Sequence, residues 1–261
     1  MSTSLDGIRS EVINLYKRRS ETPLQTIERH VKSHPEYKGV KMTYAGRLDP
    51  MAEGVLVVLS GEKNKEREAY TGLDKDYEFE FAFGVETDTF DVLGKIVATS
   101  DAERIAKERV DAGLRAYLGE FEQKYPPYSS KVVNGTPLYE LSRKGLLHEE
   151  DIPSHKVSVR KIELLSSRTI SKDDLVEFIY RTVSAVSGDF RQSEILKAWN
   201  MYFSERAPEE TVIYKARVSC GSGFYVRQLV SDLGKALGPG AVTISIVRTR
   251  VGEYRIEDSI R

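Results

Sequence analysis

Apolar and polar side chains alternate most regularly at residues 77–83, where an aromatic residue stands at every odd position. Such a period of two is typical of a strand that buries one of its faces. The same alternation recurs at 212–220, and shorter apolar runs elsewhere have the length of strands. The complete set of predicted strands is 12–16, 55–59, 77–83, 156–166, 174–182, 212–220 and 242–254.

Apolar residues with helical spacing predict a second group of elements. Thr22 is suited to cap a helix, Pro23 to occupy its first position and Gln25 to complete a capping box. The apolar face of this first helix is predicted to consist of Leu24, Ile27 and Val31. The other predicted helices run from a capping box at 100–103 to about 119, and over 137–145, 191–204 and 225–237.

Strands and helices are interspersed without the regular alternation that builds a doubly wound parallel sheet. The pattern therefore predicts an α+β fold with a large mixed, mostly antiparallel sheet flanked by helices and loops. A chain of 261 residues has room for one large domain or two small ones, and no repeat or linker is visible in it.

Composition excludes several classes of protein. Hydrophobic residues make up 40% of the chain and charged residues 30%, as in ordinary soluble enzymes. No apolar run approaches the roughly 18 residues that would span a bilayer, and residues 1–6 lack the pattern of a signal peptide. Cys220 is the only cysteine, which rules out a disulfide within the chain and argues against a cysteine-based zinc site. These features favour the cytoplasm.

The formal net charge of −1 argues weakly against a nucleic-acid partner, although binding needs only one basic face. Basic residues gather in short runs at 17–19, 143–144, 156–161 and 248–250. Each run is either part of a face that binds a polyanion or an ordinary group of solvated surface charges. For any single run the second interpretation is favoured.

The segment from Gly46 to Gly54 contains Leu48, Asp49 and Pro50 between two structured regions. An Asp-Pro pair by itself predicts only a connecting turn. The whole segment, however, resembles the catalytic motif of the pseudouridine synthases that act on the T-loop of tRNA. The resemblance implies that Asp49 is the catalytic carboxylate.

The region from Lys75 to Gly94 resembles a second motif of the same enzymes, a Lys-x-Tyr lead-in followed by Gly-x-x-Thr-Asp-Thr-x-Asp-x-x-Gly. From its parity with Phe79, Tyr77 alone would be a core tyrosine at the edge of the buried face. The resemblance implies that Tyr77 stacks on the target base and takes part in proton transfer.

Two later segments resemble the third and fourth motifs, at 125–145 and at 221–234. Taken alone they predict a Pro-Pro loop with a surface helix, and a glycine turn at the start of a helix. The resemblance implies that Arg227 pairs with Asp49, and that Tyr225 lines the pocket.

These four motifs follow one another in the order found in the bacterial-type tRNA pseudouridine-55 synthases, and the chain is identified as similar to that family. The resemblance implies a pseudouridine synthase fold and isomerisation of a T-loop uridine of tRNA, without a cofactor or metal. It further implies a cytoplasmic monomer whose partner is tRNA, with no protein partner and no membrane. The implied substrate-binding residues are Tyr225, Tyr44, Arg47, Lys131 and Ile246.

The reaction breaks a C–N glycosidic bond, rotates the uracil and rejoins it through carbon. An ionised carboxylate must lie beside the nucleoside, and Arg227 would keep Asp49 ionised and oriented. The target base must first leave its stack in the T-loop. Tyr77 would then offer it a stacking surface.

Some residues depart from the family pattern. Tyr44 stands where a histidine that helps to open the T-loop is usual, so base flipping here is expected to differ or to use Tyr44. Lys131 lies one position earlier than the usual lysine, which Val132 replaces. The first block reads Lys-Arg-Arg-Ser at 17–20 in place of Lys-Pro-x-Gly. We expect one catalytic domain over 1–261, no C-terminal RNA-binding domain, and therefore salt-sensitive binding of tRNA.

Three alternatives stay open. Glycoside hydrolysis uses two carboxylates at a set separation, but no recognised motif places Glu53 as the second one. A tRNA-binding module could help tRNA to fold without catalysis. A related synthase could act on another RNA, because RNA specificity lies in shape and loops.

Overall fold

The computed structural model describes residues 9–101 and 105–261. By its internal contacts the chain divides into two compact units, unit 1 formed by Met1–Glu78 with Ile246–Arg261 and unit 2 formed by Phe79–Ser245. Strands β4 (Lys75–Phe83) and β12 (Ala241–Val251) each begin in one unit and end in the other. Among the described residues, no helix is long and apolar enough to cross a membrane. The N-terminal residues to which the signal-peptide prediction applies lie outside the described ranges.

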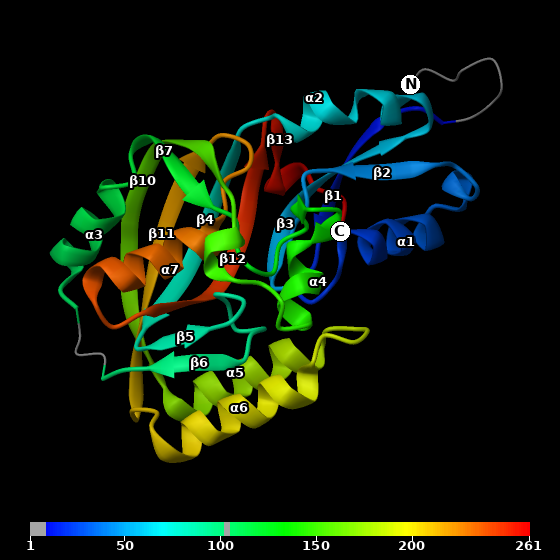
Figure 1. Ribbon diagram of the computed structural model, residues 1–261. Coiled ribbons are helices and arrows are strands. Elements are labelled where there is room, and N and C mark those ends of the chain that lie inside the picture. The colour runs from blue at the N-terminus through cyan, green and yellow to red at the C-terminus, as the bar shows by residue number, and fades with distance from the viewer. Residues whose placement is uncertain (1–8, 102–104) are drawn as a thin grey trace. The chain divides into compact units, whose positions relative to one another are not determined.

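The described residues form a nine-stranded sheet with the order β1-β3-β12-β4-β11-β10-β7, in which β2 also pairs with β3 and β13 with β12. The remaining bounds are β1 Val12–Lys17, β2 Met42–Ala45, β3 Ala52–Ser60, β7 Gly119–Lys124, β10 Ser154–Ser171, β11 Glu210–Cys220 and β13 Tyr254–Arg255. Strand β12 runs parallel to β3. The pairs β1–β3, β2–β3, β10–β11, β10–β7 and β12–β13 are antiparallel. The predicted α+β fold with a mixed, mostly antiparallel sheet is confirmed (Figure 1).

In unit 1, helix α1 (Pro23–Ser33) starts at the predicted capping box, because the Thr22 hydroxyl accepts from Gln25 and the Gln25 side chain accepts from the Thr22 backbone. Its buried face includes Ile27 and His30, but Leu24 is 59% exposed and its predicted burial is wrong. Other short helices of this unit are η1 (Pro35–Tyr37), η2 (Gly61–Glu66), α2 (Arg67–Thr71) and η4 (Ile256–Asp258).

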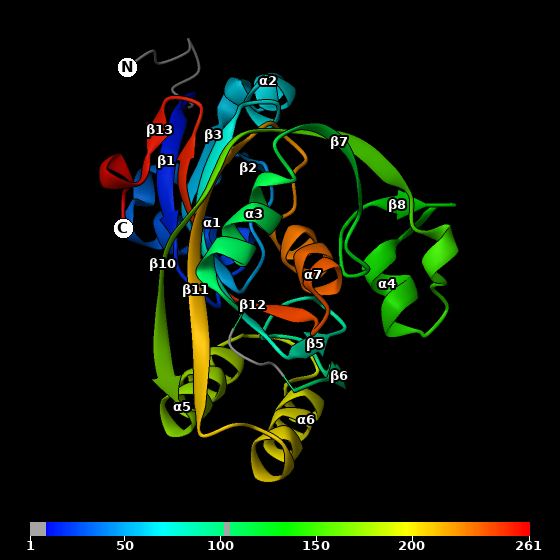
Figure 2. The same cartoon turned by 90° about the vertical axis from the view of Figure 1, so that its left-hand side faces the viewer.

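Unit 2 adds helices and hairpins to its part of the sheet. The hairpins are β5 (Val85–Thr87) with β6 (Ile96–Thr99), and β8 (Val132–Val133) with β9 (Thr136–Pro137). The helices are α3 (Lys107–Arg115), α4 (Leu138–Arg143), η3 (Glu149–Asp151), α5 (Lys172–Ser184), α6 (Gln192–Glu205) and α7 (Val226–Leu237). Figure 2 shows α3 beside α7, and α5 beside α6.

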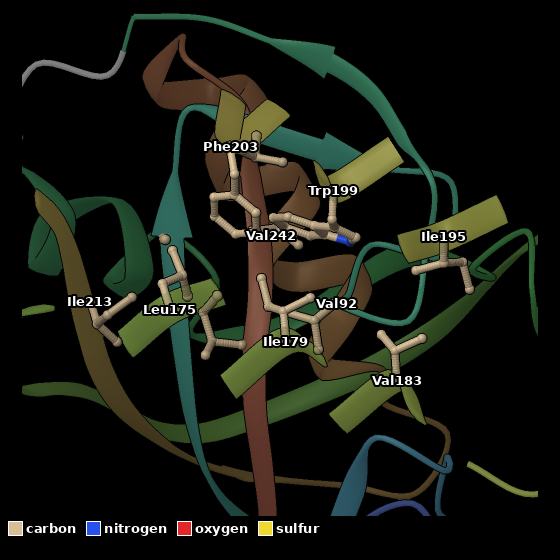
Figure 3. Close-up of a cluster of buried hydrophobic side chains, with 12 residues drawn as sticks. Val92, Leu175, Ile179, Val183, Ile195, Trp199, Phe203, Ile213 and Val242 are labelled. Carbon is tan, nitrogen blue, oxygen red and sulfur yellow. The ribbon is translucent and has the colours of Figure 1, made fainter. Parts of the chain in front are cut away.

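The predicted strand at 174–182 is wrong, because these residues belong to helix α5. Ser171 caps this helix by accepting a hydrogen bond from the Asp174 backbone. Leu175, Ile179 and Val183 then recur every fourth residue and form one buried face. Figure 3 shows this face with Trp199 and Phe203 of α6 in the core of unit 2.

The predicted helix from 100 to about 119 is shorter in the structure. Part of its capping box, residues 102 and 103, lies outside the described residues. Helix α3 begins at Lys107 and ends at Arg115, and Gly119 already belongs to strand β7. The other predicted helices and strands are confirmed in type.

Candidate active site

In unit 1, the loop that carries Asp49 connects β2 to β3 and is held by a buried arginine. Arg248 of β12 has no exposed surface, and it donates to the carbonyl oxygens of Val55 at 2.8 Å and of Gly46 and Arg47 at 3.2 Å. Gly54 closes the loop with a φ of 110°, and a Cβ there would lie 2.3 Å from the Arg248 carbonyl oxygen. Only glycine fits this approach, and the guanidinium fixes the loop backbone at both ends.

A second buried cation holds the middle of the same loop. The Lys17 ammonium donates to the carbonyl oxygens of Ala52 at 2.6 Å, Arg18 at 3.1 Å and Pro50 at 3.5 Å. Burial lowers the pKa of Lys17 to about 7, although the charge of Asp49 acts to raise it. The interpretation of the runs at 17–19 and 248–250 as exposed surface charge is therefore wrong for Lys17 and Arg248, because both lie in the interior and serve loop carbonyls.

Asp49 itself is half-buried between Leu48, which is 4% exposed, and Pro50. Its carbonyl oxygen accepts from the Ala52 backbone at 3.0 Å, and the Pro50 carbonyl accepts from the Ser20 backbone at 2.7 Å. The first of these bonds closes the tight turn predicted for an Asp-Pro pair, and the second ties the turn to Ser20. The turn, the buried leucine and the two cations together restrict the backbone that carries the carboxylate.

Tyr77 lies in β4 and is 7% exposed, in agreement with its predicted place at the edge of the buried face. Its neighbour Asp76 receives two hydrogen bonds from the Arg250 guanidinium, at 2.6 and 2.9 Å, and one from Thr249 to its carbonyl oxygen. Lys75, two residues before Tyr77, is buried and donates to the backbone carbonyls of Thr71 and Leu73. The strand is therefore fixed directly beside the tyrosine.

In unit 2, Arg227 lies in the first turn of helix α7 and is 3% exposed. It donates to the carbonyl oxygens of Thr89 at 2.6 Å and of Tyr128 at 3.3 Å. Its Nε lies 3.6 Å from the carboxylate of Asp91, which also accepts from the Thr89 hydroxyl at 2.7 Å and from the Leu93 backbone at 2.9 Å. Asp91 is not among the site residues predicted from the sequence, although it belongs to the second motif. The predicted pair of Arg227 with Asp49 joins residues of two units and stays a prediction.

Tyr225 precedes helix α7, and a buried glutamine holds its backbone. The Gln123 side chain accepts from the Tyr225 N–H at 2.9 Å and donates to its carbonyl oxygen at 3.1 Å. The Tyr225 ring meets the rings of Tyr125 and His155 edge-on, with centroids 5.8 and 6.1 Å apart. Lys131 Nζ lies 5.2 Å from the centroid of Tyr125. The structure therefore brings Tyr225 and Lys131 to the same tyrosine ring, and Gln123 and His155 are contacts that the sequence did not predict.

The remaining predicted residues lie in unit 1. The Tyr44 side chain is half-buried and packs against the cluster of Ile13, Leu56 and Val58. Arg47 is exposed on the loop. Ile246 is 4% exposed and pairs with Ala52, at the start of β3. Unit 1 thus holds Asp49, Tyr77, Tyr44, Arg47 and Ile246, whereas Lys131, Tyr225 and Arg227 belong to unit 2. The roles of all eight residues stay predictions.

A family model described as TruB family pseudouridylate synthase, N-terminal domain, matches residues 32–188. A protein of Bacteroides thetaiotaomicron named tRNA pseudouridine synthase B is 31% identical over 88% of this chain and 80% of its own length. A protein of the same name from Phocaeicola vulgatus is 31% identical over 90% of this chain and 81% of its own length. The family model and these relatives define an RNA pseudouridine synthase. The chain belongs to the TruB family, which confirms the prediction made from its motifs.

A solved structure titled "Crystal Structure of a Cbf5-Nop10-Gar1 Complex" has a similar fold. The TM-score is 0.55 at 18% sequence identity, and the match covers 94% of this chain. The chain spans about half the length of that solved chain, 49%. At this identity the likeness concerns the fold alone.

Proposed function

We propose that this protein converts a uridine of the tRNA T-loop, at position 55, into pseudouridine, with Asp49 as the catalytic carboxylate. The relatives named tRNA pseudouridine synthase B support tRNA as the substrate. The observation that carries the assignment of Asp49 is the construction of its loop. Lys17 and Arg248 hold the loop backbone from the interior, which is the rigidity that a catalytic group requires.

The reaction is an isomerisation in which atoms and electrons balance within the nucleoside. The bond between N1 and the sugar breaks, the uracil turns, and C5 forms the new bond to the sugar. The proton on C5 leaves, and N1 gains one, so that no oxidant or reductant is consumed. Asp49 acts at the sugar or base of the reacting nucleoside, and Tyr77 takes part in moving the C5 proton.

The base reaches these groups only after it leaves the T-loop stack. Tyr77 then provides a stacking surface, a contact that is worth on the order of 1–3 kcal/mol in single-stranded complexes. Tyr225 and Lys131, which both contact the Tyr125 ring, are proposed to bind the RNA around the flipped nucleotide. Arg227 is proposed to pair with Asp49 and to keep it ionised.

Tyr44 has a separate proposed role, in opening the T-loop in place of the usual histidine. Its ring packs against an apolar cluster, so it has less freedom than an exposed side chain. Replacing Tyr44 with phenylalanine tests the hydroxyl, and replacing it with alanine tests the ring. If both variants flip and modify the uridine at normal rates, Tyr44 has no part in base flipping.

The decisive experiment mixes the purified protein with an unmodified tRNA transcript and maps pseudouridine along it. We expect a product in the T-loop with the natural protein and none with Asp49→Asn, while tRNA binding is retained. Glu62→Gln is a matched control in unit 1, since Glu62 is 69% exposed and forms a surface ion pair with Lys65. Normal product formation by Asp49→Asn would contradict the assignment.

The same assay separates the rival functions. Binding without product under all conditions would favour a tRNA-binding module that assists folding. A product in another RNA, but not in the tRNA T-loop, would favour a related synthase. Tyr77→Phe is expected to bind tRNA normally and to lose turnover, and full activity would leave stacking as its only role. The proposed setting is the cytoplasm, where the protein acts as a monomer.

A further inference from the structure

Arg191 adopts an unusual backbone conformation at the start of helix α6. Its φ is 61° and its ψ is 28°, which places a residue with a Cβ in the left-handed region. This region is unfavourable for all residues except glycine and, to a lesser degree, asparagine and aspartate. Such a conformation persists only where the surroundings hold it, and it frequently accompanies a functional constraint. The contacts of the Arg191 side chain identify what holds it.

The Arg191 guanidinium is enclosed by two side chains from other parts of unit 2. It binds both carboxylate oxygens of Asp88, at 2.6 and 3.4 Å, and lies 4.5 Å from the ring centroid of Tyr128. The Tyr128 hydroxyl donates to the same carboxylate at 3.2 Å. The side chains of Arg191 and Asp88 are only 13% and 19% exposed. Ion pair, ring contact and hydrogen bond therefore close a three-residue cluster.

Two residues supply the backbone carbonyls that accept from Arg227. One of them, Tyr128, belongs to this cluster, and the other, Thr89, follows Asp88 in the chain. Asp88 is followed by Thr89, whose carbonyl oxygen accepts from Arg227 at 2.6 Å. The carbonyl oxygen of Tyr128 itself accepts the second bond, at 3.3 Å. The Tyr128–Asp88 hydrogen bond joins the two acceptor segments, one in the Pro-Pro loop and one in the second motif, and Arg191 adds an ion pair to one and a ring contact to the other.

We propose that Arg191 is a positioning residue for Arg227. By reinforcing the direct hydrogen bond between Tyr128 and Asp88, it fixes the two carbonyl groups that orient the Arg227 guanidinium. The inference rests on the proposed function, in which Arg227 serves the uridine site. Arg191 is not expected to touch the RNA, so its loss should change turnover and leave binding unchanged.

The charged groups around Arg191 suit this positioning role. Burial lowers the pKa of Arg191, but the hydrogen bond and charge of Asp88, together with Tyr128 and Glu194, raise it above its ordinary value. Asp88 is anchored on its other side by the Lys95 backbone, which donates to it at 2.9 Å. The Arg191 guanidinium therefore stays charged at all pH values at which the enzyme would work.

Two substitutions of Arg191 distinguish the effect of its side chain from the effect of its backbone conformation. Arg191→Gln removes the charge and keeps the strained conformation, whereas Arg191→Gly removes the side chain and adopts a left-handed backbone without strain. We expect both to lower kcat between about ten- and a hundredfold, as is typical of small misplacements of catalytic groups. The dissociation constant for tRNA should change less than about twofold, because no phosphate contact is lost. Arg181→Gln, at an exposed ion pair of α5, is the matched control and should match the natural protein.

A double-mutant cycle tests the route through Asp88. If Arg191 acts by holding Asp88, the variant carrying both Arg191→Gln and Asp88→Asn should have the same kcat as the slower single variant. Additive losses would overturn the proposal, as would a natural kcat in Arg191→Gly. An unfolded protein in both Arg191 variants would make the cluster purely structural and would overturn it too. Asp49→Asn, measured in parallel, shows separately whether the proposed function itself stands.

Discussion

The Asp49 loop in unit 1 and the surroundings of Arg227 in unit 2 are both built on buried cations, but the partners of these cations differ. Around Asp49, Lys17 and Arg248 donate to backbone carbonyl oxygens. Around Arg227, the cations meet carboxylates as well, with Asp91 beside Arg227 and Asp88 beside Arg191. In the Asp49 loop, basic side chains thus hold the backbone through neutral carbonyl groups. Around Arg227, basic side chains are also paired with carboxylates.

The difference has electrostatic consequences. A carbonyl oxygen satisfies a donor but carries no net charge, so it compensates little of the cost of burying an ammonium group. The pKa of Lys17 accordingly falls to about 7, with burial as the main cause. Burial also acts to lower the pKa of Arg191, but Asp88, with Tyr128 and Glu194, raises it above its ordinary value. The Asp49 loop should therefore respond to pH near neutrality through Lys17, whereas Arg191 should stay charged there.

The largest effect is expected from Arg248→Met. Methionine fills a similar volume but leaves the carbonyl oxygens of Gly46, Arg47 and Val55 without their donor. With a cost of about 1–3 kcal/mol for each buried group left unsatisfied, the free energy of unfolding should fall by roughly 3 kcal/mol or more. Urea denaturation measures this loss. Arg255→Met, at an exposed position of the same unit, is the control, and equal stability of the two variants would show that the bonds from Arg248 to the loop contribute nothing.

The second prediction concerns pH. Between pH 7 and the unfolded pKa of Lys17, 10.5, the unfolded chain keeps a proton on Lys17 that the folded protein has released. The folded protein therefore gains stability as pH rises through this window and loses it as pH falls towards 7. The stability of the natural protein relative to Lys17→Met should rise by about 2 kcal/mol from pH 7 to pH 9. Other titrating groups cancel in this difference, so a flat difference would show that Lys17 does not titrate there.

The third prediction concerns Arg250 and Asp76. This pair lies in unit 1, but like the arginines of unit 2 its cation has a carboxylate as partner. Both side chains are about one quarter exposed, at 26% and 21%, and joined by two hydrogen bonds. A double-mutant cycle with Arg250→Gln and Asp76→Asn should give a coupling energy on the order of 1 kcal/mol in the free energy of unfolding. A coupling energy as large as the loss of unfolding free energy in Arg248→Met would mean that the type of partner, carboxylate or carbonyl, does not affect stability.

Much of the fold could be predicted because burial imposes a local pattern. The alternation at 77–83 and the capping box at Thr22 depend on neighbours a few residues away, and both are confirmed. Helix α5 was missed because its run of β-branched and aromatic residues after Leu175 is also typical of a strand. The cap from Ser171 to Asp174 was the signal that would have decided between helix and strand.

The site divides in the same way. Asp49 and Arg227 could be proposed because they stand within recognisable motifs. The supporting cations could not, because a charged residue in a sequence is normally interpreted as exposed. Arg248 also reaches its acceptors across about 200 residues of chain, with a sequence separation of 202 to Gly46, which no local pattern records.

The smallest effect is expected from an ion pair at the surface, between Lys95 and Glu194. Lys95 binds Glu194 at 3.0 Å, but the two side chains are 39% and 61% exposed. Water competes for both groups, so Lys95→Gln should change the free energy of unfolding by less than about 0.5 kcal/mol. That difference should vanish in roughly 1 M salt, where the screening length is about 3 Å. Arg248→Met should keep its full effect in the same salt, since its partners are buried. If the two variants instead responded alike to salt, burial would not be what separates the cations of the Asp49 loop from ordinary surface charges.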